Sequence, residues 1–167
     1  DLFAPTLVSF KLDMSSSRLW LEFSETVDCE DVNPAMFEVV STGVANPAST
    51  CVDVALVTTS VRLTGGTKCS HTGNDAINRW TSVYFDLVDI DMNAIKLDRQ
   101  LATSKCNTFL AMHAGSVVDM NSIEGAVIPV NAGLQVCETG CFNSDGVDPT
   151  LTHFNLNMDN GILYLTF

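Results

Sequence analysis

The sequence predicts an all-β protein: an antiparallel sandwich of two sheets with one short helix. Along most of the chain, short runs alternate apolar with polar residues, and clusters of Gly, Pro, Asn, Asp and Ser separate these runs. One stretch, residues 89–99, has acidic residues at its start and basic residues toward its end, the charge order that suits a helix dipole. Regularly spaced short strands with at most one helix are typical of two packed antiparallel sheets.

The individual elements follow from the same patterns. Residues 7–12 and 19–23 alternate on either side of a polar turn at 15–17, which predicts a half-buried hairpin. We expect Asp89 or Asp91 to cap a short helix over residues 92–97, with Lys96 and Arg99 toward its end. The other expected strands span residues 36–40, 52–57, 61–63, 80–88, 108–113 and 125–130.

The last twenty residues of the chain repeat its beginning. At an offset of 144 and without a gap, residues 4–23 and 148–167 agree at nine of twenty positions. Self-similarity at a fixed period is the signature of a repeat array. We therefore expect a complete module with its linker at residues 1–147, followed by the first hairpin of the next repeat at residues 148–167. The apolar alternation runs up to Phe167, whereas its counterpart continues past Phe23, which predicts a segment of a longer chain.

The second copy of the hairpin needs a partner, because a lone two-stranded hairpin is marginal in water. Further chain could complete it, or separate subunits could polymerise by donating these strands to a neighbour's sheet. Beads on one chain are favoured, since an acceptor module already has its own hairpin at residues 7–23. In either case the apolar contact surface would come from Leu151, Phe154, Leu156, Met158, Leu163, Tyr164, Leu165 and Phe167.

Composition restricts the class of partner. The formal net charge is −12, and the eight Lys and Arg residues form no cluster, which excludes nucleic acid as a partner. Only 17% of the residues are charged and the mean hydropathy is positive. This excess of apolar residues favours contacts between modules, with a well-filled core as the alternative. The chain contains no run of 18 apolar residues, so we expect no membrane span in this segment.

The cysteine count indicates an oxidising compartment, and therefore an extracellular location, secreted or at the cell surface. Six cysteines form an even set in a chain with few charges. Cys137 and Cys141 can close a small loop, and we expect Cys51 to pair with Cys69 and Cys29 with Cys106. The alternative is that some of them are buried free thiols.

No motif for catalysis or for a cofactor is present. Residues 89–93 imitate the start of a calcium loop, but Ala94 and Gln100 stand where an EF-hand needs Gly and Glu. The spacing of Cys137, Cys141 and His153 fits no ordinary zinc finger. The three histidines lie on separate segments, so we expect neither an enzyme nor a metal site. Calcium at module junctions stays open as an alternative, held by carboxylates such as Glu25, Asp28, Glu30, Asp31, Asp119 and Asp148.

Three short motifs resemble a known family. The sequences APTLVSF at residues 4–10, FSETV at 23–27 and DMN at 119–121 are similar to tandem immunoglobulin-like repeats of secreted surface proteins. Such repeats occur in bacterial surface-layer and adhesin proteins and in long eukaryotic extracellular proteins, including those of hair-like appendages. The six cysteines and the helix depart from a minimal bacterial module and favour a eukaryotic secreted origin.

The resemblance implies an immunoglobulin-like sandwich repeated in tandem. It also implies a structural role in an extracellular filament, stalk or appendage, with copies of the same module as partners. The alternative function is an adhesin or ligand-binding domain that recognises a carbohydrate or a cell-surface protein. In that case Trp80 or the loop between Cys51 and Cys69 would be the place to look.

Overall fold

The computed structural model describes residues 3–45, 49–51, 57–67, 70–71, 79–137 and 139–167. These residues form short β-strands arranged in sheets, one α-helix and four short 3-10 helices. The prediction of an all-β protein with one short helix is therefore confirmed. The 3-10 helices span Cys29–Asp31, Pro34–Met36, Lys105–Asn107 and Val130–Ala132.

The larger sheet has the strand order β5-β6-β2-β1-β9. Its neighbours pair antiparallel except β9, which runs parallel to β1, so the expectation of purely antiparallel sheets is wrong at this pair. The chain leaves Cys141 alongside β1 in the same direction, and the Leu12 and Met14 amides donate to the Cys141 and Asn143 carbonyls. The strands are β1 (Leu7–Asp13), β2 (Arg18–Asp28), β5 (Ser70–His71), β6 (Arg79–Asp86) and β9 (Phe142–Asn143).

The smaller sheet has the order β4-β3-β7-β8 and packs across a shared core against the larger one. The Phe37 ring of β3 lies 5.7 Å from the Phe85 ring of β6, centroid to centroid, so the two sheets meet directly. All four residues of β7 are buried. The strands are β3 (Phe37–Val40), β4 (Ser60–Arg62), β7 (Phe109–Met112) and β8 (Leu134–Gln135).

Helix α1 (Asp89–Leu97) confirms the expected helix but begins differently. Its N-cap is Val88, with no side-chain cap, so the prediction that Asp89 or Asp91 caps it is wrong. The Asp91 carboxylate is buried instead and accepts hydrogen bonds from the Thr64 amide at 2.8 Å and the Thr64 hydroxyl at 2.9 Å. These hydrogen bonds attach helix α1 to the segment after β4. Asp91 bonds to Thr64 because a buried carboxylate without partners costs more free energy than an exposed helix amide without a cap.

One of the other expected strands differs from the structure, and another falls on residues that the structure does not describe. Residues 125–130 form no continuous strand: Ile128 makes an isolated bridge to Met112, and a 3-10 helix begins at Val130. Pro129 has no amide hydrogen to donate, so a longer ladder cannot form there. For the strand expected at 52–57, residues 52–56 lie outside the described part of the chain.

Disulfide pairing differs from the expectation except at one bridge. Cys137 pairs with Cys141 as predicted, but Cys51 pairs with Cys106, so the predicted Cys51–Cys69 and Cys29–Cys106 bridges are wrong. The Gln135 side chain donates from Nε2 to the Lys105 carbonyl beside this bridge, and this bond holds the segment around Cys106 against β8. Cys29 is also disulfide-bonded, and Cys69 lies outside the described residues. Disulfides are compatible with an extracellular location.

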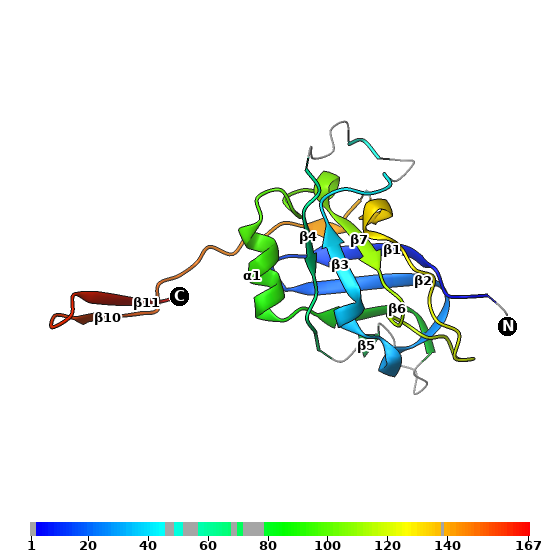
Figure 1. Cartoon of the computed structure of the whole chain (residues 1–167), viewed down its shortest axis with the longest axis horizontal. Coiled ribbons are helices and arrows are strands. Elements are labelled where there is room, and N and C mark those ends of the chain that lie inside the picture. The colour runs from blue at the N-terminus through cyan, green and yellow to red at the C-terminus, as the bar shows by residue number, and fades with distance from the viewer. Residues whose placement is uncertain (1–2, 46–48, 52–56, 68–69, 72–78, 138) are drawn as a thin grey trace.

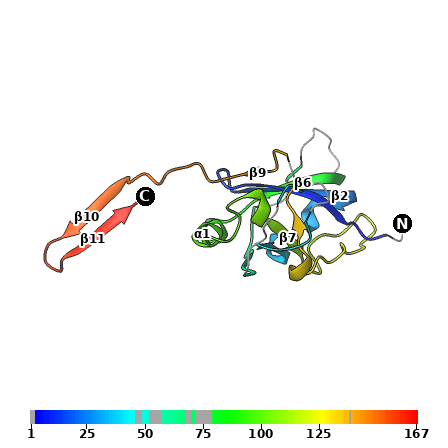
Figure 2. The ribbon, with the colours of Figure 1, turned by 90° about the horizontal axis from the view of Figure 1, so that it is seen from above.

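The chain begins and leaves at opposite ends of the two packed sheets. The N-terminus lies at one end, and the chain leaves beside α1 at the opposite end (Figure 1). Beyond this exit, β10 (His153–Asn157) and β11 (Ile162–Thr166) form a separate two-stranded sheet. Both views show this hairpin standing apart from the two packed sheets (Figures 1 and 2). Among the described residues, no helix has the length and apolar character needed to cross a membrane.

Candidate functional site

The detached hairpin reproduces the strand register of the first hairpin. In β1 and β2, Phe10 pairs with Leu21 and Leu12 with Leu19. In β10 and β11, Phe154 pairs with Leu165 and Leu156 with Leu163. The offset of 144 relates all four residues of one hairpin to those of the other. The sequence repeat is thus also a repeat of the strand pairing.

The turns of the two hairpins are built in the same way. The Asp13 carboxylate accepts hydrogen bonds from the Ser15 and Ser16 amides, at 2.9 and 3.1 Å. The Asn157 side-chain oxygen accepts from the amides of residues 159 and 160, at 3.0 and 3.4 Å. Each turn then passes through a residue of positive φ, Ser17 at 56° and Gly161 at 71°. Asp and Asn both form this turn, and glycine is the residue best suited to positive φ.

The burial of the two hairpins is opposite. Phe10 is 1% exposed, whereas its counterpart Phe154 is 61% exposed. Met14 is 3% exposed, and its counterpart Met158 is 80% exposed. Seven apolar positions are buried in the first hairpin, identical in the second and exposed there: Leu7, Phe10, Leu12, Met14, Leu19, Leu21 and Phe23, matched by Leu151, Phe154, Leu156, Met158, Leu163, Leu165 and Phe167.

Outward-facing positions differ between the copies. The cross-strand pair Lys11 and Trp20 in the first hairpin becomes Asn155 and Tyr164 in the second. Because alternate residues of a strand face opposite sides, Tyr164 lies on the face opposite the apolar one. Of the residues expected from the sequence to form a contact surface, all except Tyr164 therefore share one face of the hairpin. We call the seven exposed positions in residues 151–167 the apolar hairpin face.

The segment leading to the hairpin is attached to the first module. The Gly146 amide donates to the Ser15 hydroxyl at 3.2 Å, and that hydroxyl donates to the Ser144 carbonyl at 3.2 Å. The Lys96 ammonium lies 3.1 Å from the Asp145 carboxylate. This hydrogen bond from Lys96, with another from the Val147 amide, holds the pKa of Asp145 below its ordinary value. Both α1 and the first hairpin turn thus fix where the chain leaves the module.

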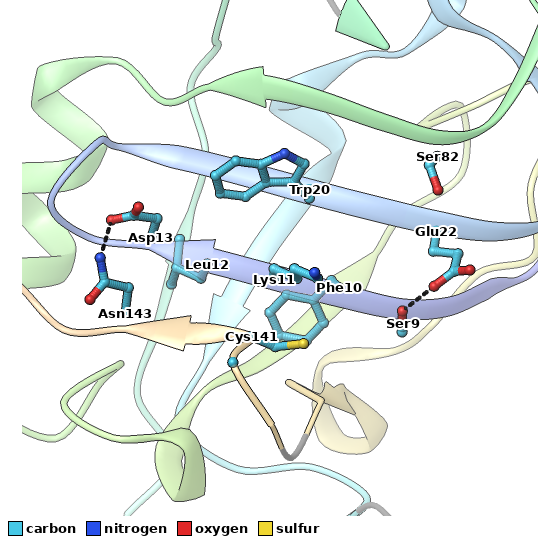
Figure 3. Close-up of a pocket in the computed structure, with 11 residues that line it drawn as sticks. Ser9, Phe10, Lys11, Leu12, Asp13, Trp20, Glu22, Ser82, Cys141 and Asn143 are labelled. Atoms are coloured by element: carbon cyan, nitrogen blue, oxygen red, sulfur yellow. Dashed lines mark hydrogen bonds between the residues drawn. The ribbon is translucent and has the colours of Figure 1, made fainter. Parts of the chain in front are cut away.

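A groove of about 490 Å³ crosses the outer face of the larger sheet. Trp20 lines it, with Lys11 and Glu22 on the same face (Figure 3). The groove reaches Ser82 on β6 and, beyond β1, Asn143 on β9. The sequence analysis named Trp80 instead, and Trp80 packs against the core. The alternation of residues 18–22 was the signal that could have placed Trp20 on an outer face, since Leu19 and Leu21 face inward.

Side chains of three strands form cross-strand rows on this outer face. One row contains Lys11, Trp20 and Tyr84, and the rings of Trp20 and Tyr84 have centroids 6.2 Å apart. Arg18 in the next row stacks its guanidinium 4.4 Å from the centre of the Tyr84 ring and forms an ion pair with Asp86. The hydrogen bonds that Arg18 donates to the Asp86 carboxylate raise the pKa of Arg18. Arg18 is therefore engaged within the sheet.

Polar side chains of the other rows flank the groove. The Ser9 hydroxyl donates to Glu22 Oε2 at 2.8 Å, and Glu22 is the cross-strand partner of Ser82. The Asn143 Nδ2 donates to Asp13 Oδ1 at 3.0 Å, which closes one end of the groove. Burial raises the pKa of Asp13, but the hydrogen bonds from Ser16, Ser15 and Asn143 outweigh it and leave that pKa lowered.

Two of the carboxylates considered for calcium accept hydrogen bonds from the backbone. The Asp28 side chain accepts from the Glu30 amide at 2.9 Å. The Asp119 side chain accepts from the Asn121 and Ile123 amides at 2.8 and 2.6 Å. Across the described parts of the chain, no three His, Cys, Asp or Glu side chains converge as a ligand set for a metal ion.

Comparisons with models of protein families, with curated proteins and with solved structures found no match.

Proposed function

We propose that this protein is a structural module of an extracellular filament, stalk or surface appendage built from tandem immunoglobulin-like repeats. Residues 1–147 form one module with its linker, and residues 148–167 contribute the first hairpin of another. The partner is therefore another copy of the same module, and the location is outside the cell.

One observation carries the proposal: the inward-facing residues of the second hairpin are the same as those of the first. All seven apolar positions that the first hairpin buries recur unchanged, whereas the outward positions 11 and 20 change to Asn155 and Tyr164. An exposed surface hairpin has no physical need for such an apolar face. A hairpin that fills an equivalent core does need this face, because each large apolar side chain contributes about 1.5–3 kcal/mol of stability when it is buried.

The path of the chain supports a linear array. The N-terminus and the exit of the chain lie at opposite ends of the module (Figure 1). The hydrogen bonds of Ser15 and the Lys96–Asp145 pair attach the exit segment, so its direction is set by the first module. Modules joined in this way extend head to tail, as a filament or stalk requires.

Covalent tandem repeats explain the hairpin better than strand exchange between subunits. A donated segment replaces a strand that its acceptor lacks. Here the larger sheet already contains both β1 and β2, paired along most of their length. The hairpin therefore starts a new core.

The mass of the native chain and its appearance test this proposal together. The natural protein is extracted and its mass is measured under reducing, denaturing conditions, while the native material is imaged by electron microscopy. The proposal expects a mass several times the 18.0 kDa of these 167 residues, together with filaments or stalks. A mass near 18.0 kDa with filaments would favour strand donation instead. Isolated particles of that mass would contradict the structural role.

A further inference from the structure

We propose that the groove over Trp20 binds a neutral carbohydrate, a chain of uncharged pyranose units. This inference does not rest on the proposed filament role. It assigns a binding function to the outer face of the larger sheet, whereas the hairpin argument concerns only the inner face.

The shape and the lining of the groove suit an extended sugar chain. The groove is open along the sheet and crosses β6, β2 and β1, ending beside Asn143 (Figure 3). Trp20 lines the groove and is half-buried, and its indole is supported by the Tyr84 ring and by the Arg18 guanidinium, which lies 5.7 Å from the centre of the indole ring. A supported aromatic ring offers a flat apolar surface with little conformational entropy to lose, and the C–H face of a pyranose is the complementary apolar surface.

The polar side chains around Trp20 suit hydroxyl groups. Glu22 uses Oε2 to accept from Ser9 and still presents a carboxylate at an exposed position. Lys11 stands beside Trp20 as its cross-strand partner and is exposed. Together they offer an acceptor and a donor beside one aromatic ring. Sugar hydroxyls both donate and accept, so a pyranose stacked on Trp20 can satisfy both groups.

Charge decides between a neutral and an acidic sugar. Glu22 and Asp13 place two carboxylates in the groove against one ammonium, that of Lys11. The chain as a whole carries a net charge of −12. Sulfated or carboxylated polysaccharides would be repelled, because like charges that are brought together in a partly desolvated groove disfavour binding. The carbohydrate is therefore an uncharged one.

The test is a titration of the full chain followed by NMR. The ligands are uncharged hexasaccharides of β-1,4-glucan, β-1,3-glucan, mannan and chitin, with a sulfated hexasaccharide as the comparison. We expect at least one neutral ligand to shift the Trp20 indole signal and the amides of Lys11 and Asn143 at millimolar concentration or below. The sulfated ligand should leave these signals in place.

Three substitutions make the test specific. Trp20→Ala should weaken binding of the neutral ligand at least about tenfold, and Trp20→Phe should weaken it less, because the phenyl ring keeps an apolar face. Tyr164→Ala is the matched control: Tyr164 has the same register position in the second hairpin but does not line this groove, and binding should be unchanged. If Trp20→Ala fails to fold, Glu22→Ala, at an exposed position, takes its place and should also weaken binding.

Several results would overturn the inference. It is wrong if none of the neutral hexasaccharides shifts the groove signals, or if Trp20→Ala and Glu22→Ala fold and bind as tightly as the parent chain. It is also wrong if the sulfated ligand binds more tightly than the neutral ones. Groove signals that move only when the protein itself is concentrated would show that a second copy occupies this face, which would likewise contradict it.

Discussion

Leu12 and Leu156 occupy the same position in two hairpins of identical register, yet Leu12 is 1% exposed and Leu156 is 49% exposed. Each leucine faces its counterpart across the strands, Leu19 in the first hairpin and Leu163 in the second. The difference in burial comes from what lies beneath them: the core of the module covers the first pair, whereas the second pair stays about half exposed in the described structure. This pair of residues supplies matched substitutions.

Leu12→Ala should lower the free energy of unfolding of the module by about 2–5 kcal/mol, because it removes fully buried methyl groups and leaves a cavity. Leu156→Ala should change it by less than about 0.5 kcal/mol, since that side chain is not part of the module's core. Urea unfolding of the full chain, followed by near-UV circular dichroism, measures both values. Equal effects of the two substitutions would show that the second hairpin packs on the first module.

Ser17→Gly should stabilise the module modestly, by about 0.5–1 kcal/mol. Ser17 has a φ of 56°, in the left-handed region, where a side chain costs energy and glycine does not. The repeat has glycine at the equivalent position 161, with a φ of 71°. Thermal and urea unfolding of Ser17→Gly and of Ser17→Ala separate the backbone effect from loss of the hydroxyl. A Ser17→Gly variant that is less stable than the Ser17→Ala variant would contradict this account of the turn.

The two described disulfides should contribute unequally to stability. Cys51 and Cys106 are 55 residues apart, whereas Cys137 and Cys141 are 4 apart. Loop-closure entropy predicts about 4 kcal/mol for the longer loop and about 2 kcal/mol for the shorter one. The measurement compares the unfolding free energy of the Cys51→Ala/Cys106→Ala and Cys137→Ala/Cys141→Ala double variants with that of the parent. A larger loss from the short loop would show that native packing, and not chain entropy, decides the contribution.

The Lys96–Asp145 ion pair should make the attachment of the exit segment depend on pH. The pKa of Asp145 lies below its ordinary value of 3.8, so the pair contributes fully above that value and is lost as the pH falls through the lowered pKa. We expect the backbone amides of residues 144–147 to become more mobile over that range in NMR relaxation. Asp145→Asn should give the more mobile segment at neutral pH and remove the pH dependence. Relaxation that is the same for Asp145→Asn and the parent at neutral pH would exclude this role.

Local patterns were sufficient to predict most strands, the helix and the second hairpin. Alternation places Phe10 and Leu12 on one face of their strand independently of the rest of the fold. The first hairpin and its copy could therefore be predicted from the sequence. Long-range features could not be predicted in this way. The pairing of Cys51 with Cys106 depends on how the 3-10 helix at Lys105–Asn107 packs beside β8, and the parallel pairing of β9 depends on where the chain leaves the module.

The site was predictable only in part. All seven positions of the apolar hairpin face could be predicted from the sequence, because identity across the repeat marks them. The groove could not be predicted, because that surface joins residues of β6, β2, β1 and β9, which are distant in the chain. Asp91 was assigned to a helix cap, since its partner Thr64 becomes visible only when β4 is packed beside α1.

The most direct test asks whether residues 148–167 can begin a second module. Residues 24–147 are appended directly after Phe167, so that the second hairpin is followed by the segments that follow the first. Hydrogen exchange then compares the amides of Leu156 and Leu163 in this extended chain and in the parent. We predict that their exchange slows to the rates of Leu12 and Leu19, because they enter an equivalent core. Exchange as fast as in the parent, with the appended segment unfolded, would contradict the claim that this hairpin starts a further repeat.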